Sequence, residues 1–142
     1  MANASPKVAT AIATVFSLHR FVALSFGVIL FAFPEELNEA MAPSKVMVFE
    51  EKFSLQSWGP FIIAVAMIVH FARNFDSQAQ RSIAWAMFVC FTLESALYGH
   101  TLANFDPNVD PTYKTGVLAT GSVFIGLFIL YGAALAVDYR DA

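Results

Sequence analysis

AIATVFSLHRFVALSFGVILFAF, residues 11–33, is a run of mainly apolar residues that ends at Pro34-Glu35-Glu36. An α-helix needs roughly 20 such residues to cross the ~30 Å hydrocarbon core of a bilayer. The run is therefore long enough to span a membrane. It is also longer than the apolar part of a signal peptide, so we expect it to be a retained anchor.

Three further runs of the same kind follow along the chain. We predict four membrane-spanning helices, at about Ala11–Phe33, Leu55–Ala72, Ile83–Leu102 and Thr115–Val137. A chain in lipid must satisfy its own backbone groups, which favours helices, and the alternation of apolar and polar residues typical of strands is missing. The predicted fold class is all-α, an integral membrane bundle of four transmembrane helices that forms one domain over residues 1–142.

The next two expectations concern the start of the second span and the connection that precedes it. Trp58-Gly59-Pro60 opens it, and Pro60 is then tolerated because a proline in the first turn loses no internal hydrogen bond. The preceding connection, Glu35–Ser54, is the longest in the chain. It is amphipathic in places, as at Met47-Val48-Phe49, so it is either a short helix along the interface or an ordinary solvated loop.

The composition agrees with a membrane protein. Hydrophobic residues make up 58% of the 142 residues and charged residues 13%, whereas soluble domains have about 25% charged residues. The net charge of −3 offers no basic patch for a nucleic acid. Four spans place both termini on one side of the membrane, and a four-to-three split of the basic residues favours the cytoplasmic, matrix or stromal side.

Ionisable groups inside a span are energetically costly, so each one is a candidate functional residue. Arg20 lies near the middle of the first span and Glu94 near the middle of the third. Each shares a helical face with small or polar residues; these faces are Ala13, Ser17, Arg20 and Gly27, and Ala86, Cys90, Glu94 and Thr101. We therefore predict an Arg20–Glu94 ion pair between the two helices, which holds them in register. The single cysteine, Cys90, is expected to be a small core residue.

The three histidines, His19, His70 and His100, are candidate cofactor ligands. Histidine in a helical bundle can bind haem iron or the magnesium of chlorophyll. A haem held by His19 and His70 stays open but is not favoured, because the two lie ~12 Å and ~3 Å from the same membrane surface at 1.5 Å per residue. His100 lies towards the opposite surface. A pigment site needs one histidine, and the 15 phenylalanines offer flat surfaces, although phenylalanine also suits contact with lipid.

The fourth span contains no charged residue between Thr115 and Val137. Its small residues predict a packing helix, with Ser122 and Gly126 at the spacing that lets membrane helices approach closely.

The stretch Ser17-Leu18-His19-Arg20, followed by Gly27, resembles the quinone-site helix of the succinate dehydrogenase cytochrome b membrane anchor. The resemblance covers about one helix. It implies that Ser17 and Arg20 line a quinone pocket.

The sequence shows no hydrolytic triad and no nucleotide-binding loop, and no span is broken as in many transporters. We interpret the chain as a non-catalytic subunit of a larger bioenergetic complex, photosynthetic or respiratory, in an organellar or bacterial energy-transducing membrane. Its expected partners are lipids and other membrane subunits, and chlorophyll and haem b are the candidate cofactors. The alternative is an electron-transfer anchor that binds haem b or quinone through Ser17, His19, Arg20 and His70. A small channel or carrier is a third interpretation, which a single intramembrane ion pair supports only weakly.

Overall fold

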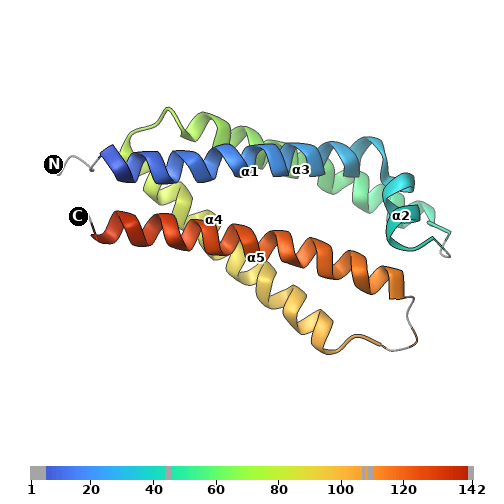
Figure 1. The fold of residues 1–142 in the computed structure, drawn as a ribbon. Coiled ribbons are helices and arrows are strands. Elements are labelled where there is room, and N and C mark those ends of the chain that lie inside the picture. The colour runs from blue at the N-terminus through green and yellow to red at the C-terminus, as the bar shows by residue number, and fades with distance from the viewer. Residues whose placement is uncertain (1–5, 44–45, 107, 109–110, 141–142) are drawn as a thin grey trace.

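The computed structural model describes residues 6–43, 46–106, 108 and 111–140, with side chains from residue 11 to residue 137 of these ranges. The described chain is helical with short connections (Figure 1). Its helices are α1 (Pro6–Ala32), α2 (Pro34–Met41), α3 (Phe49–Ala72), α4 (Ser77–Ala103) and α5 (Pro111–Arg140). Four of them, α1, α3, α4 and α5, are long and apolar enough to cross a membrane. The predicted all-α class and the four spans are confirmed.

Pro34 separates the first span from a short helix. The residue before a proline is disfavoured in the helical conformation, and Phe33 accordingly has φ −131° and ψ 46°. Proline is well suited to the first position of a helix, so Pro34 also begins α2. Of the two alternatives for this connection, the structure thus shows a short helix, at Pro34–Met41, and the amphipathic residues from Phe49 on belong to α3.

The second span begins earlier than predicted. Helix α3 starts at Phe49, six residues before Leu55, so Pro60 lies inside the helix and not in its first turn. Proline has no N–H, and α3 therefore lacks the backbone hydrogen bond from residue 60 to the carbonyl of Gln56. The amphipathic stretch from Phe49 to Lys52 belongs to the helix, and Lys52 pairs with Glu35 of α2 at 2.5 Å.

Two side chains fix the turn between α3 and α4. The carboxylate of Asp76 accepts a hydrogen bond from the backbone N–H of Ala79 (2.9 Å), which caps the start of α4. The buried Gln80 amide donates to the carbonyls of Arg73 (2.9 Å) and Phe75 (3.1 Å). The tight turn keeps α3 and α4 adjacent at this end of the bundle.

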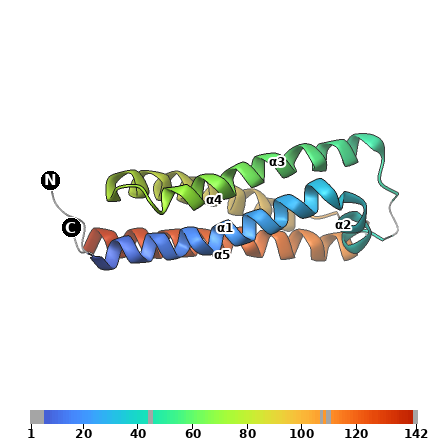
Figure 2. The same ribbon diagram turned by 90° about the horizontal axis from the view of Figure 1, so that it is seen from above.

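The spans form two closely packed pairs, α1 with α3 and α4 with α5, and α1 also lies against α5 (Figure 2). The start of α1 and the end of α5 lie at the same end of the bundle, here called the terminal end (Figure 1). Towards the other end, α4 crosses α5 and diverges from α1 and α3 (Figure 1).

The buried core lies in the terminal half of the bundle, where all four spans meet. Its largest fully buried side chains are Tyr131, Phe16, Ile12 and Val69. Aromatic rings join α4 to α5: Phe88 stacks on Phe128 at 5.1 Å between centroids, and Phe91 stacks on Phe124 and Tyr131.

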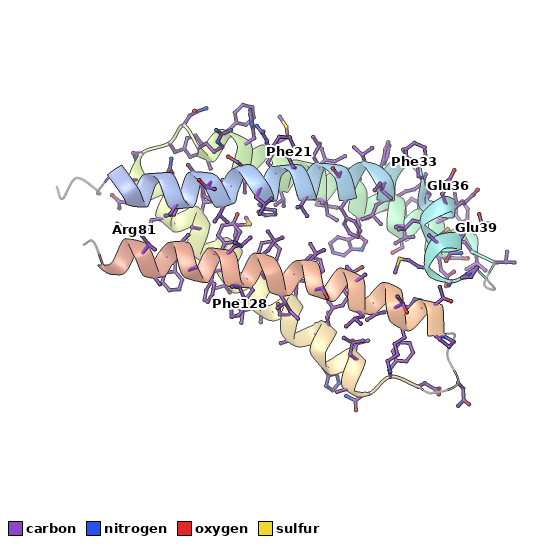
Figure 3. All side chains as sticks on the ribbon, in the orientation of Figure 1. Phe21, Phe33, Glu36, Glu39, Arg81 and Phe128 are labelled. Atoms are coloured by element: carbon purple, nitrogen blue, oxygen red, sulfur yellow. The ribbon has the colours of Figure 1, made fainter. Side chains whose placement is uncertain are left out.

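Other aromatic and charged side chains lie outside this core. Phe21 on α1 and Phe33, the residue after the end of α1, are exposed (Figure 3). Glu36 and Glu39 lie at the end opposite the termini, and Arg81 lies near the terminal end (Figure 3). The charged groups labelled in this view thus mark the two ends of the bundle.

Candidate functional site

Arg20 is bonded to the neighbouring span α3. One nitrogen of its guanidinium group lies 2.7 Å from Nδ1 of His70, and the group also sits 4.3 Å from the centroid of the Phe21 ring. The side chain of Arg20 is half-buried. Because side chains on a helix tilt towards its N-terminus, the long arginine side chain extends towards the terminal end of the bundle.

His19, the preceding residue, points to a different helix. Its Nδ1 lies 2.8 Å from the hydroxyl oxygen of Tyr131 on α5, and its ring meets Phe91 of α4 edge-on at 5.0 Å between centroids. Only 3% of His19 is exposed. Consecutive residues of an α-helix point about 100° apart, so this one step in sequence changes the partner helix from α5 to α3.

These two hydrogen bonds connect α1 to the two spans that it contacts most, α3 and α5. Arg20 joins α1 to α3, and His19 joins α1 to α5. An unsatisfied polar group in hydrocarbon costs several kcal/mol, roughly, so a bond of this kind disfavours separation of the helices. The four side chains, with Phe91 packed on His19, form what we call the His19–Arg20 cluster.

The packing of α1 on α3 brings Arg20 and His70 to a similar depth. A Cβ atom on Gly27 would lie 2.8 Å from Cγ1 of Ile63, so these two residues are level with each other. Arg20 is seven positions before Gly27, and His70 is seven positions after Ile63 on the antiparallel helix. The depth difference that the span boundaries predict between the histidines is therefore wrong, because α1 extends fourteen residues from Arg20 back to its start at Pro6, whereas α3 ends two residues after His70.

The predicted Arg20–Glu94 ion pair is not formed within the described residues. The face of α1 that carries Arg20 and Gly27 packs on α3, not on α4. The face of α3 that packs against Arg20 and Gly27 carries Gly59, Ile63 and His70. Glu94 is half-buried on α4, one helical turn from Cys90 and Tyr98.

Three other residues that were singled out from the sequence take no part in the hydrogen bonds of the cluster. The Ser17 hydroxyl donates to the carbonyl of Ala13 (2.8 Å) in its own helix, an arrangement that needs no ligand. His100 is exposed near the end of α4, beside the Asn104 amide (3.3 Å). Cys90 is exposed, which corrects the expectation that it lies in the core.

The hydrogen bond to Arg20 restricts what His70 can bind. A guanidinium group donates and never accepts, so Nδ1 of His70 is the acceptor and the proton of the neutral ring is on Nε2. In that state neither nitrogen has a free lone pair for haem iron or chlorophyll magnesium. The site fits helix packing better than it fits a metal-centred ring.

His19 is restricted by its surroundings. The ring is buried between Phe91 and Tyr131, which both meet it edge-on. A macrocycle would have to displace one of these core rings. Over the residues that the structure describes, no group of three or more His, Cys, Asp or Glu side chains is placed to hold a metal ion.

Tyr131 is the member of the cluster that the sequence did not reveal. From the sequence, the fourth span was considered only for its small residues. In the structure, Gly116 faces Met41 of α2, and Gly121 and Gly132 face Tyr98 and Phe88 of α4. A tyrosine in the interior of the span was the available signal, because the hydroxyl of a buried tyrosine usually has a hydrogen-bond partner.

Comparisons of this chain with protein-family models, curated proteins and solved structures gave no match.

Proposed function

We propose that this chain is a non-catalytic structural subunit of a larger membrane-protein assembly, and that other subunits cover α4. The main support is a mismatch between the polarity and the burial of this helix. Helix α4 has the lowest mean hydropathy of the four spans. Yet in the most apolar 18-residue segment of α4, 11% of the residues are buried within the bundle. The corresponding shares are 22% in α3, 28% in α5 and 33% in α1.

In a bundle that works alone in lipid, the reverse arrangement is expected. Polar residues of membrane helices usually face other helices or a water-filled cavity. Here the exposed residues of α4 include Cys90, Thr92, His100 and Thr101. A surface of this kind is better covered by protein than by lipid tails.

Helix α5 offers a second surface of the same character. Ser122 is exposed, and a Cβ atom on Gly126 would meet nothing within 4 Å. Ala119 and Ala133 lie on the same outward face. Small residues at this spacing allow close helix contact, and none of the helices that the structure describes uses them here.

The His19–Arg20 cluster supports the non-catalytic part of the proposal. Its polar groups are used to join α1 to α3 and α5, as expected for a scaffold. We keep a respiratory or photosynthetic complex as the narrower proposal. Its support is the large outward aromatic surface, which includes Phe21, Phe31, Phe61 and Phe71 and suits lipid tails or pigments.

The mass of the native particle tests this function. The chain, carrying an affinity tag, is extracted from its native membrane in a mild detergent, and its protein mass is measured by light scattering. We expect a particle well above the 15.5 kDa of one chain. A monodisperse single chain from native membranes would contradict the proposal. An absorption spectrum of the same particle tests the bioenergetic setting, since haem or chlorophyll in the assembly would give characteristic bands.

A further inference from the structure

Glu94 has no counterion among the residues that the structure describes. It lies seventeen residues after the start of α4 at Ser77 and nine before its end at Ala103, well inside the span. Its side chain is half-buried, and within the described residues it takes part in no hydrogen bond and no ion pair. A carboxylate at this depth is costly unless it is paired.

The basic residues whose side chains the structure describes cannot supply the missing partner. Arg20 is the one Lys or Arg in the interior of a described span, and it is engaged with His70. The others in the spans, Lys52, Arg81 and Lys114, lie within the first five positions of α3, α4 and α5. They are therefore near the membrane surfaces and not at the depth of Glu94.

A second copy of this chain does not solve the problem either. Two copies that met symmetrically through this part of α4 would bring two Glu94 carboxylates together. Like charges in close contact disfavour each other, and neither copy offers a free cation at that depth.

We propose that the face of α4 formed by Ala86, Cys90, Glu94, Leu97 and Thr101, called the Glu94 face, binds a transmembrane helix of another protein that carries a Lys or Arg near the bilayer midplane. The four residues around Glu94 are exposed. Ala86 and Cys90 are small, so the partner backbone can approach closely and its basic side chain can reach the carboxylate. This inference rests on the proposed function, because it names the partner of the α4 surface.

Charge variants in the native assembly test the inference. Glu94→Gln keeps the shape and removes the charge, and Glu94→Lys reverses it. We expect the first to weaken recovery of the assembly roughly tenfold and the second to abolish it. Glu39→Gln, an exposed carboxylate on α2, is the matched control and should have no effect. The thermal stability of the isolated chain should not fall in Glu94→Gln, which separates loss of binding from loss of folding.

A photocrosslinker identifies the occupant. A benzophenone side chain at Leu97, which is 58% exposed on the Glu94 face, should crosslink to an apolar segment that contains a Lys or Arg near its centre. The same group at Leu118 on α5, 54% exposed, is the control and should not capture that segment. Reversing the partner's basic residue to Glu should restore assembly with Glu94→Lys.

Several outcomes overturn the inference. One is an assembly that tolerates both Glu94 variants; another is a crosslinked segment without a basic residue. A third is a Cys90–Cys90 disulfide dimer on mild oxidation in the membrane, which would show that a second copy occupies the face. In these cases the chain is still a subunit and the proposed function stands. If the native particle is a single chain, the proposed function fails and the inference fails with it.

Discussion

Gly27 and Gly59 face each other where α1 crosses α3. A Cβ atom on Gly27 would lie 2.9 Å from the carbonyl oxygen of Gly59, and a Cβ atom on Gly59 would lie 2.8 Å from that of Gly27. Both distances are shorter than ordinary van der Waals contact, and the atoms involved belong to backbones, which cannot rotate away. The close approach of the two helices therefore depends on the absence of a side chain at these positions.

Replacing either glycine by alanine should force the two helices apart. We expect Gly27→Ala and Gly59→Ala each to lower the free energy of unfolding by about 1–3 kcal/mol, because the added methyl group overpacks the crossing. The measurement is reversible unfolding of the purified protein in mixed micelles.

Gly99→Ala is the matched control for these substitutions. Gly99 lies in α4, and a Cβ atom there would meet nothing within 4 Å. Alanine favours the helix over glycine by up to about 1 kcal/mol, so this variant should be as stable as the parent or more so. Equal losses at Gly27 and Gly99 would show that the crossing is looser than the structure indicates.

The sequence predicts the number and type of the membrane spans but not which helix faces which. Length and hydropathy determine the four spans, because the bilayer sets a fixed thickness. The face of α1 that carries Arg20 was recognised, and His70 of the second span was singled out as a candidate ligand. Their contact was not, because helical periodicity describes a face of one helix and carries no information about the neighbouring helix.

The errors at the span boundaries have a similar cause. The start of the second span was placed by its apolar residues and by Pro60, but α3 extends past the apolar run to Phe49. Backbone hydrogen bonding continues through polar residues such as Glu51 and Lys52, so a helix is longer than the membrane that it crosses. The depths predicted for His19 and His70 are wrong for another reason: the start of α1 and the end of α3 are not level with each other, so distances counted from these two ends cannot be compared.

Because of the Arg20–His70 bond, substituting His70 should lower the stability more than substituting Arg20. His70→Ala leaves a guanidinium group inside the bundle without its acceptor, whereas Arg20→Met leaves a neutral ring. We expect His70→Ala to cost about 1.5–3 kcal/mol of stability, Arg20→Met less, and the double variant less than His70→Ala alone. Unfolding measurements on all four proteins of the cycle give the coupling free energy directly.

The same cycle with Glu94→Gln in place of His70→Ala serves as its control. Arg20 and Glu94 share no bond, so their effects on stability should add. Coupling between Arg20 and Glu94, with none between Arg20 and His70, would contradict the arrangement of the cluster.

Tyr131→Phe tests the link between α1 and α5. The substitution removes the hydroxyl bonded to His19 and keeps the ring that stacks on Phe91 at 5.8 Å. We expect a loss of about 0.5–1.5 kcal/mol, the usual contribution of one hydrogen bond. Tyr113→Phe removes a hydroxyl from an exposed residue and should have no measurable effect. Equal stabilities of Tyr131→Phe and the parent would mean that packing alone holds α1 against α5.

Haem titration separates the scaffold interpretation from the electron-transfer anchor. Arg20 obliges Nδ1 of His70 to accept a hydrogen bond, which leaves the ring proton on Nε2, and His19 is enclosed by Phe91 and Tyr131. A bis-histidine haem would have to break the first arrangement and displace a core ring from the second. We therefore expect haem added to the purified protein to show no sharp low-spin α band after reduction, and His70→Ala to leave the spectrum unchanged. A low-spin haem b spectrum that both His19→Ala and His70→Ala abolish would favour the anchor, because it would require the cluster to open around a cofactor.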